Sequence, residues 1–339
     1  VKDLRLVGGV RYEYADATIK AFDSTFNRIL KIDTSPYKKH NIAPGASVTY
    51  SLNDRSNLRA AFSKSIARPD FREITPGQYV TLIDDEVMHG NPDLKQSEIY
   101  NYDLRWEWFP SGGELIALSI FYKNIDKPIE LLELKGTSGT AIYKYKNATS
   151  ADNMGIELEI RKDFGFIAKP LKTISTLINV AYIYSKIELP DFNIDTAVIT
   201  GDQQYTTKDR PLQGQSPYVI NVGLNWSLKN AGFDSTLLFN INGKRIMRVG
   251  TLAGTPLIPE NQVKRGDVYE QPAPKLDFVI KQKLASLNGE LKLVAANLLN
   301  PEVKYTERSQ AGSGGDYKTY TIYKVRKGMD FKISYTQKL

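Results

Sequence analysis

The sequence offers few residues that could perform acid–base or metal chemistry. Its two histidines are His40 and His89, and Asp84, Asp85 and Glu86 lie just before His89. A carboxylate that orients an imidazole can activate water, so this segment could hold an Asp–His pair. We favour a solvated acidic loop, because one imidazole without further ligands also makes a poor metal site. No catalytic residue, metal site or cofactor is therefore expected.

A second polar group surrounds Phe71 directly after a strand-like segment and consists of Arg68, Asp70, Arg72 and Glu73. These side chains could line an opening at which a ligand first arrives. The alternative, which we favour, is that Arg68 and Asp70 pair with neighbouring strands and fix the point where the loop leaves them. Tyrosines in predicted loops could stack on a flat or sugar-like ligand, namely Tyr79, Tyr205, Tyr269 and Tyr305. The candidate ligand contacts are therefore Arg68, Asp70, Arg72, Tyr79, Tyr205 and Tyr269.

Two short patterns carry little weight. Ser313, Gly314 and Gly315 lack the Gly-Lys-Ser/Thr ending of a phosphate-binding loop and predict a flexible loop. Asn147, Ala148 and Thr149 match a glycosylation acceptor, a pattern that is too short to be specific.

Composition limits the class of protein. The 339 residues include 20 Tyr and 13 Phe but no Cys, which excludes disulfides and thiolate metal sites. The net charge of +7 is spread without a basic cluster, so nucleic acid is not an expected partner. The mean hydropathy of −0.36 argues against membrane-spanning helices, but membrane-spanning strands barely raise this average.

The elements that must position these residues are alternating strands. In residues 100–108, Tyr100, Tyr102, Leu104, Trp106 and Trp108 share one face, while Asn101, Asp103, Arg105 and Glu107 share the other. The aromatic face must meet an apolar surface, and membrane lipid is the surface that such a strand suits. The charged face then lines a lumen, where replacing Arg105 by Leu is expected to leave folding largely intact.

The same alternation recurs along the chain and predicts about twelve strands. Short connections fall near 52–55, 110–112, 163–172, 230–232 and 286–288. They alternate with long ones near 15–40, 66–97, 125–140, 188–215, 246–272 and 301–321. A soluble sandwich has no reason to place all its long loops at one end, whereas outer-membrane barrels combine short periplasmic turns with long external loops. The fold class is therefore an all-β, antiparallel transmembrane β-barrel, with the last strand ending on the periplasmic side.

Several phrases resemble one known family. They are Ala67-Arg68-Pro69-Asp70-Phe71, Gly90-Asn91-Pro92-Asp93-Leu94, Glu107-Trp108-Phe109-Pro110 and Ala296-Asn297-Leu298-Leu299-Asn300. Together they resemble the C-terminal part of the barrel of TonB-dependent outer-membrane receptors, particularly the Bacteroidetes type. Members have about 22 strands around a plug domain. The resemblance thus implies that residues 1–339 are a partial barrel domain without the plug and the early strands, and the chain ends in Leu339 where members usually have Phe.

The resemblance also implies a function. Such receptors bind a scarce nutrient, an iron–siderophore, cobalamin or a glycan, at their external loops and lumen, and import it. The implied partners are the ligand, the TonB complex acting through the absent plug, and outer-membrane lipid. Two alternatives stay open: a self-contained passive pore or barrel enzyme of twelve strands, and a structural barrel within an envelope complex.

Overall fold

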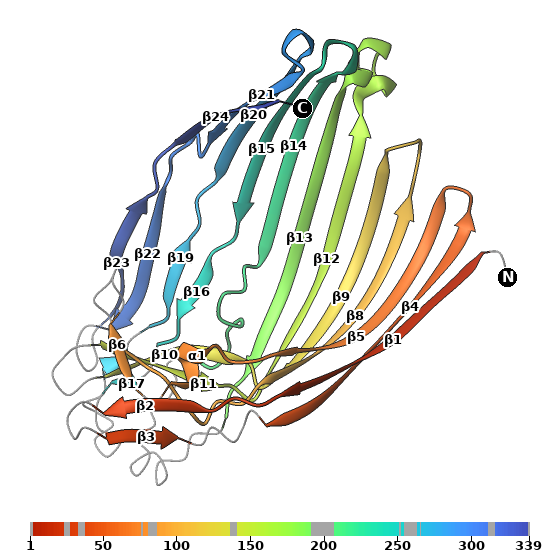
Figure 1. Ribbon diagram of the computed structural model, residues 1–339. Coiled ribbons are helices and arrows are strands. Elements are labelled where there is room, and N and C mark those ends of the chain that lie inside the picture. Colours follow the sequence, from red (N-terminus) through yellow and green to blue (C-terminus); the bar gives the residue numbers. More distant parts are fainter. Residues whose placement is uncertain are drawn as a thin grey trace.

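A single large antiparallel sheet dominates the computed structural model (Figure 1). The structure describes residues 3–23, 28–32, 38–75, 77–80, 87–135, 141–190, 207–250, 252–253, 263–264, 266–310 and 316–337. The 12 strands of this sheet, in spatial order, are β1 (Leu4–Ala15), β4 (Lys39–Asn53), β5 (Ser56–Ala67), β8 (Ser97–Trp108), β9 (Leu115–Asp126), β12 (Ser150–Asp163), β13 (Ile174–Glu188), β14 (Tyr218–Leu228), β15 (Phe233–Asn242), β20 (Lys275–Leu284), β21 (Gly289–Ala296) and β24 (Asp330–Gln337).

Sequence order and spatial order agree throughout this sheet, and every neighbouring pair is antiparallel. Short turns join the strands at one end and long connections join them at the other, which confirms the predicted alternation. The sheet curves into a trough, with both chain ends at the end that carries the short turns (Figure 1). In the described part of the chain, the outer edges of β1 and β24 are not paired with each other, so the sheet is not closed.

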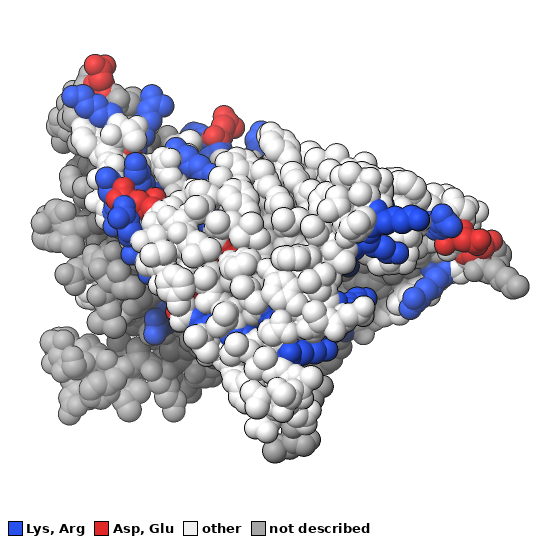
Figure 2. Space-filling view, turned by 90° about the horizontal axis from the view of Figure 1, so that it is seen from above, with Lys and Arg blue, Asp and Glu red and all other residues white. Residues whose placement is uncertain are grey.

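One face of the sheet is apolar, as the alternation predicted. Ala60, Leu104 and Ile120 lie opposite one another on β5, β8 and β9. Large apolar side chains are exposed on the face that carries Leu104, and Leu104 itself is 41% exposed. Figure 2 shows a broad area of the molecule with few charged side chains, which gather mainly toward its margins. This is the face that fits lipid.

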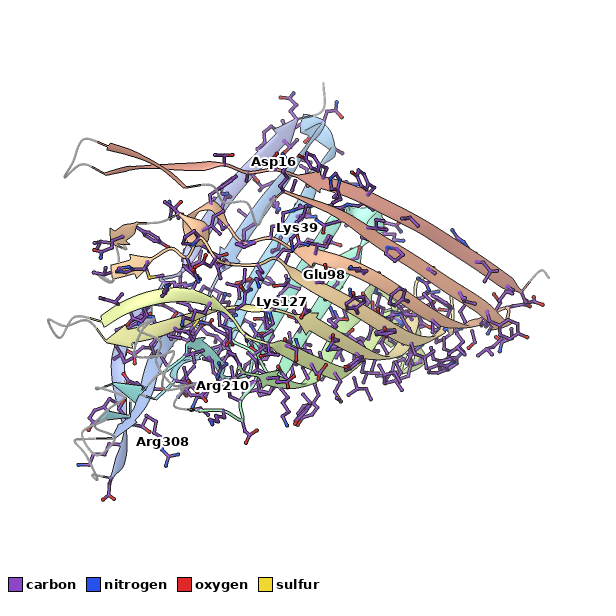
Figure 3. The ribbon with its side chains drawn as sticks, turned by 90° about the horizontal axis from the view of Figure 1, so that it is seen from below. Asp16, Lys39, Glu98, Lys127, Arg210 and Arg308 are labelled. Atoms are coloured by element: carbon purple, nitrogen blue, oxygen red, sulfur yellow. The ribbon has the colours of Figure 1, made fainter. Side chains whose placement is uncertain are left out.

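Aromatic and polar side chains border the apolar face. Near the short turns, the Trp106 indole donates to Ser56 Oγ at 2.9 Å. Near the long connections, the Tyr102 and Tyr122 rings lie 6.0 Å apart, and the Tyr122 hydroxyl donates to Asp152 at 2.6 Å. Charged groups follow at the strand ends, where Asp16, Lys39, Glu98 and Lys127 succeed one another (Figure 3). Aromatic rings followed by charges are typical of a membrane–water interface.

The opposite, inner face carries an ion-pair network centred on Arg105. Its guanidinium donates to Glu107 at 2.9 Å and to Glu159 at 2.7 Å, joining β8 to β12. The Glu107 side chain is only 9% exposed. Glu107 also pairs with Arg59 at 3.6 Å, and Glu159 also pairs with Arg161 at 2.6 Å. Each carboxylate thus keeps a cation without Arg105, and the expectation that Arg105→Leu leaves folding largely intact stays a prediction.

The long connections contain more regular structure than the sequence pattern indicated. They hold β2 (Ile19–Asp23), β3 (Arg28–Ile32), α1 (Phe71–Ile74), β6 (Gln78–Val80), β7 (Val87–His89), β10 (Ile129–Lys135), β11 (Ala141–Asn147), β16 (Arg245–Arg248), β17 (Leu252–Ala253), β18 (Val263–Lys264), β19 (Val268–Gln271), β22 (Glu302–Gln310) and β23 (Tyr317–Arg326). Strands β16, β19, β22 and β23 form a sheet that continues the wall of β15, β20, β21 and β24 toward the loop end (Figure 1). In the described ranges, no helix is long and apolar enough to cross a membrane.

The predicted long connection near 301–321 contains regular structure, since β22 and the start of β23 lie within it. The preceding Asn-Leu-Leu-Asn phrase explains the break between β21 and β22. Asn297 and Asn300 have positive φ angles of 56° and 39°, a conformation that Asn tolerates better than most residues. The Asn297 amide donates to the Gly328 carbonyl at 2.6 Å, and Gly328 N donates to Asn300 Oδ1 at 3.0 Å. The phrase therefore forms a turn whose two Asn side chains hold the β21–β22 connection against the β23–β24 connection.

The Gly90-Asn91-Pro92 phrase packs directly on α1. Asn91 N donates to the Glu73 carbonyl at 2.5 Å, and Leu94 and Ile74 form a buried apolar contact. A Cβ atom on Gly90 would fall well inside van der Waals contact of the Thr75 carbonyl oxygen. Only glycine allows this close approach. Two of the four phrases that resemble the family, at residues 67–71 and 90–94, therefore fold as one unit.

This contact gives a stability prediction. Gly90→Ala should destabilise the protein by about 1–3 kcal/mol through overpacking. Gly77→Ala in the same connection is the matched control, because no atom lies within 4 Å of its added Cβ. Thermal unfolding of the purified proteins checks this, and equal melting temperatures for the two variants would refute the packing argument.

Candidate ligand-binding mouth

Two long connections are joined at the loop end by one buried ion pair. Arg210, which precedes β14, donates from both terminal nitrogens to the carboxylate of Glu130 on β10, at 2.8 and 2.7 Å. Both side chains are 1% exposed. Gln213 N donates to the same carboxylate at 3.1 Å. The pair therefore links the β9–β12 connection to the β13–β14 connection without access to water.

The third connection, between β15 and β20, joins through apolar contacts. Leu132 of β10 packs against Ile246 and Val249, with Tyr269 at the margin of this cluster. Asp267 is buried beside it and accepts from Gly250 N at 3.0 Å. Burial raises the pKa of Asp267 despite the nearby Arg210. We call the four-stranded sheet of β10, β11, β7 and β6 the cap; it lies at the loop end of the trough (Figure 1).

Two of the predicted ligand contacts, Arg68 and Asp70, interact with carboxylates of the protein itself. The Arg68 guanidinium pairs with Glu13 on β1, as the structural alternative expected. Asp70 instead begins α1, with its backbone N–H donating to the Glu73 carboxylate at 2.8 Å, so its expected pairing with a neighbouring strand is wrong. Arg72 is exposed on the same helix. A ligand-contact role for these three residues stays a prediction.

The predicted tyrosines do not form one cluster. Tyr79 lies on β6, at one edge of the cap, whereas Tyr269 packs beside β10 at the other edge. Three strand spacings of about 4.8 Å separate those edges. Tyr305 stacks on Tyr323 with ring centres 4.2 Å apart, on the face of β22 opposite to Tyr269. Tyr205 lies outside the described residues.

Sequence reasoning missed the cation that accompanies Tyr269. The Lys244 ammonium lies 3.8 Å from the centre of the Tyr269 ring. Burial lowers the pKa of Lys244 and raises the pKa of the Tyr269 hydroxyl. Tyr269 also packs against the cluster of Leu132, Ile246 and Val249, so this cation–π pair lies beside the cap. No pattern in the sequence indicated that Lys244 lies beside Tyr269.

His89 lies on β7 within the cap. Asp84, Asp85 and Glu86 are outside the described residues, so the proposed Asp–His pair stays untested. Burial, followed by the nearby charge of Lys144, lowers the pKa of His89. Among the described residues, no group of three or more His, Cys, Asp and Glu side chains could hold a metal ion.

The lowered pKa of His89 predicts a pH dependence of the cap. The folded state binds a proton less readily than the unfolded chain, so the stabilising effect is fully present above the unfolded pKa near 6.5. It is lost as the pH falls through the lower folded pKa. His89→Gln should remove this acid-side loss, measured as amide exchange of β7 and β11 between neutral and acidic pH. An unchanged pH profile in the variant would contradict the assignment.

The glycosylation-like triplet has a structural explanation. Asn147 donates to the carbonyls of Lys95 and Lys127 at 2.9 and 2.8 Å and accepts from Lys95 N at 2.8 Å. Its side chain therefore fastens two long connections to each other. Ser313, Gly314 and Gly315 lie outside the described residues.

Comparison with known families decides what this curved sheet is. Residues 1–272 match the family model described as TonB dependent receptor-like, beta-barrel. The chain belongs to this family. The match confirms the resemblance to TonB-dependent receptors, although nothing in it distinguishes the Bacteroidetes type. No curated protein matches the chain.

Solved structures share the receptor barrel fold. A variant of the ferric enterobactin receptor PfeA from Pseudomonas aeruginosa in complex with enterobactin is 17% identical, with a TM-score of 0.51 over 88% of this chain and 40% of that one. The siderophore receptor PirA from Acinetobacter baumannii is 15% identical, with a TM-score of 0.53 over 99% and 44%. The copper transporter OprC is 16% identical, with a TM-score of 0.56 over 99% and 46%. The chain thus spans less than half the length of each of these proteins.

Proposed function

We propose that this TonB-dependent receptor barrel is part of an outer-membrane transport receptor. It would bind a scarce nutrient at its mouth and import it with energy delivered through TonB. The observation that carries the proposal is the family match together with the fold: strands with one lipid-fitting face and all long connections at one end. No covalent chemistry is proposed.

We also propose that residues 1–339 are one partial barrel domain that further strands complete. The two sheet edges at β1 and β24 would leave unpaired backbone groups in lipid, where each costs several kcal/mol. This favours a larger receptor over a self-contained pore of twelve strands. The structures that share the fold are about twice as long, which agrees with further strands and a plug outside this chain.

The nutrient class stays open among an iron–siderophore, cobalamin and a glycan. The related structures concern enterobactin, siderophores and copper, and at their low identity they support the fold alone. Arg68, Asp70, Arg72, Tyr79, Tyr205 and Tyr269 remain proposed contacts, with Lys244 added from the structure.

Deletion of the gene in the source bacterium tests the proposal. Growth should be impaired when one nutrient, iron, cobalamin or a glycan, is scarce or is the sole source, and loss of TonB should cause the same defect. Intact growth under all three conditions, with stoichiometric co-purification of partner subunits, would favour a structural barrel instead.

A further inference from the structure

The turn between β12 and β13 is larger than the other short turns and carries exposed apolar side chains. It contains two short 3-10 helices, η2 (Phe164–Phe166) and η3 (Lys169–Thr173). It is the longest of the short turns between neighbouring strands of the sheet, and it stands beyond the ends of β12 and β13 (Figure 1). Phe166 and Ile167 are 66% and 63% exposed. Contacts within the described chain thus leave most of both apolar side chains uncovered.

This turn bends toward the lipid-facing side of the sheet. Lys162, near the end of β12, has the same strand parity as Leu158, which lies opposite Leu118 on the lipid-facing side of β9. The Lys162 ammonium lies 5.3 Å from the centre of the Phe166 ring. Because Lys162 points away from the lumen, the ring beside it also lies on the lipid-facing side. Phe166 is thus continuous with the surface that fits lipid.

Two lysines of the same turn carry charges that the described residues do not neutralise. Lys169 and Lys172 are exposed, and neither ammonium has an ion-pair partner in the described part of the chain. The carboxylate of Glu114, on the neighbouring turn, is 7% exposed and is already paired with Lys162 at 2.6 Å. The Asp163 carboxylate begins η2 by accepting a backbone N–H of that helix. The turn therefore presents free positive charge to its surroundings.

Exposed rings beside lysines are typical of the zone where a membrane meets water. A lysine stem can lie along apolar surface while its ammonium reaches a lipid phosphate. An apolar side chain next to it inserts at the boundary between headgroups and acyl chains. Basic residues close to a membrane attract anionic lipid, and two of them are enough to change lipid affinity about tenfold. The turn thus fits a ligand that has acyl chains and an anionic headgroup.

From this arrangement we propose that the β12–β13 turn binds an anionic glycerophospholipid in the leaflet at the short-turn end. Lys169 and Lys172 contact the headgroup phosphate, and Phe166 contacts the acyl chains. A lipid is favoured over an acidic protein segment, because Phe166 continues the lipid-facing surface. The bound lipid holds this end of the wall at the headgroup layer. This site goes beyond the proposed transport function and does not depend on which nutrient is imported.

The test measures lipid binding to the intact protein in detergent by native mass spectrometry. The protein is titrated with phosphatidylglycerol, which is anionic, and with phosphatidylcholine, which has no net charge. The dissociation constant of the first bound lipid is compared for the parent protein, for Lys169→Gln with Lys172→Gln, and for Phe166→Ser. Lys95→Gln with Lys318→Gln is the matched control, because it removes two exposed lysines at the loop end. Thermal melting checks that each variant is folded.

We expect the parent protein and the control to bind phosphatidylglycerol about tenfold more tightly than phosphatidylcholine. The variant without both turn lysines should bind the two lipids alike. Phe166→Ser should weaken the binding of both lipids about fivefold and keep the preference.

Four results would overturn the proposal. They are equal affinities in the parent protein, a preference that survives the loss of both turn lysines, an equal loss of preference in the control, and unchanged affinities in Phe166→Ser. The first of them would favour an acidic periplasmic protein as the partner of this turn. A failed transport function would appear separately, as normal nutrient uptake after gene deletion.

Discussion

Replacing Glu130 with Ala should unfold the cap locally at a cost of about 3–5 kcal/mol, because it leaves Arg210 as a buried charge without its carboxylate. Both side chains are 1% exposed and joined by two hydrogen bonds, so water cannot compensate for the loss. The change should appear as faster amide hydrogen exchange in β10 and in residues 207–217. The wall strands should keep their protection, because the pair lies outside them.

Two further variants test whether this effect comes from the unpaired buried charge. Replacing both partners, Glu130→Leu with Arg210→Met, should cost less than Glu130→Ala alone, since no unpaired charge remains. Arg245→Ala removes a partly exposed pair, Arg245 with Glu270 at 2.6 Å, and should cost less than about 1 kcal/mol. If the buried and exposed pairs gave equal changes in exchange, the buried pair would not hold the connections together.

The second large effect concerns the lipid-facing side of β8. Leu104→Arg should destabilise the barrel by about 2–4 kcal/mol, because it places a guanidinium near the middle of the apolar band. Leu104 lies between Ala60 and Ile120 on the neighbouring strands, and neither can offer a counter-charge. Denaturant titration of the receptor refolded into lipid vesicles measures this cost.

Asp103→Arg is the matched control, since it introduces the same side chain one residue away, on the inner face. Asp103 is exposed, so its replacement should cost less than about 1 kcal/mol. If Asp103→Arg proved the more damaging change, the two faces of the sheet would have to be exchanged.

The strands of the barrel wall were predictable from the sequence, because each strand must turn apolar residues toward lipid and polar residues toward the lumen. Residues such as Leu104 and Arg105 alternate between lipid and lumen, and the period of two identifies each strand without knowledge of its neighbours. The alternation of short and long connections then fixed the order of the strands. Closure of the sheet could not be inferred in this way, because alternation says nothing about which edges meet.

The mouth was less predictable because its contacts join residues distant in the sequence. Glu130 and Arg210 lie 80 positions apart, and neither stands in a pattern that marks a buried pair. The extension strands β22 and β23 were missed because the kink at Asn297 and Asn300 interrupts the alternation. Tyr269 was selected from the sequence as a loop tyrosine, whereas its partner Lys244 became evident only from the folded chain.

The account depends most on the claim that alternate residues of β8 face lipid and lumen. Because the sequence contains no Cys, single cysteines introduced at positions 100–108 can be labelled with a membrane-impermeant maleimide without background from this chain. In receptor reconstituted in lipid, the account predicts labelling at 101, 103 and 105 and no labelling at 102, 104 and 106. Uniform labelling of all positions, or the opposite alternation, would contradict it.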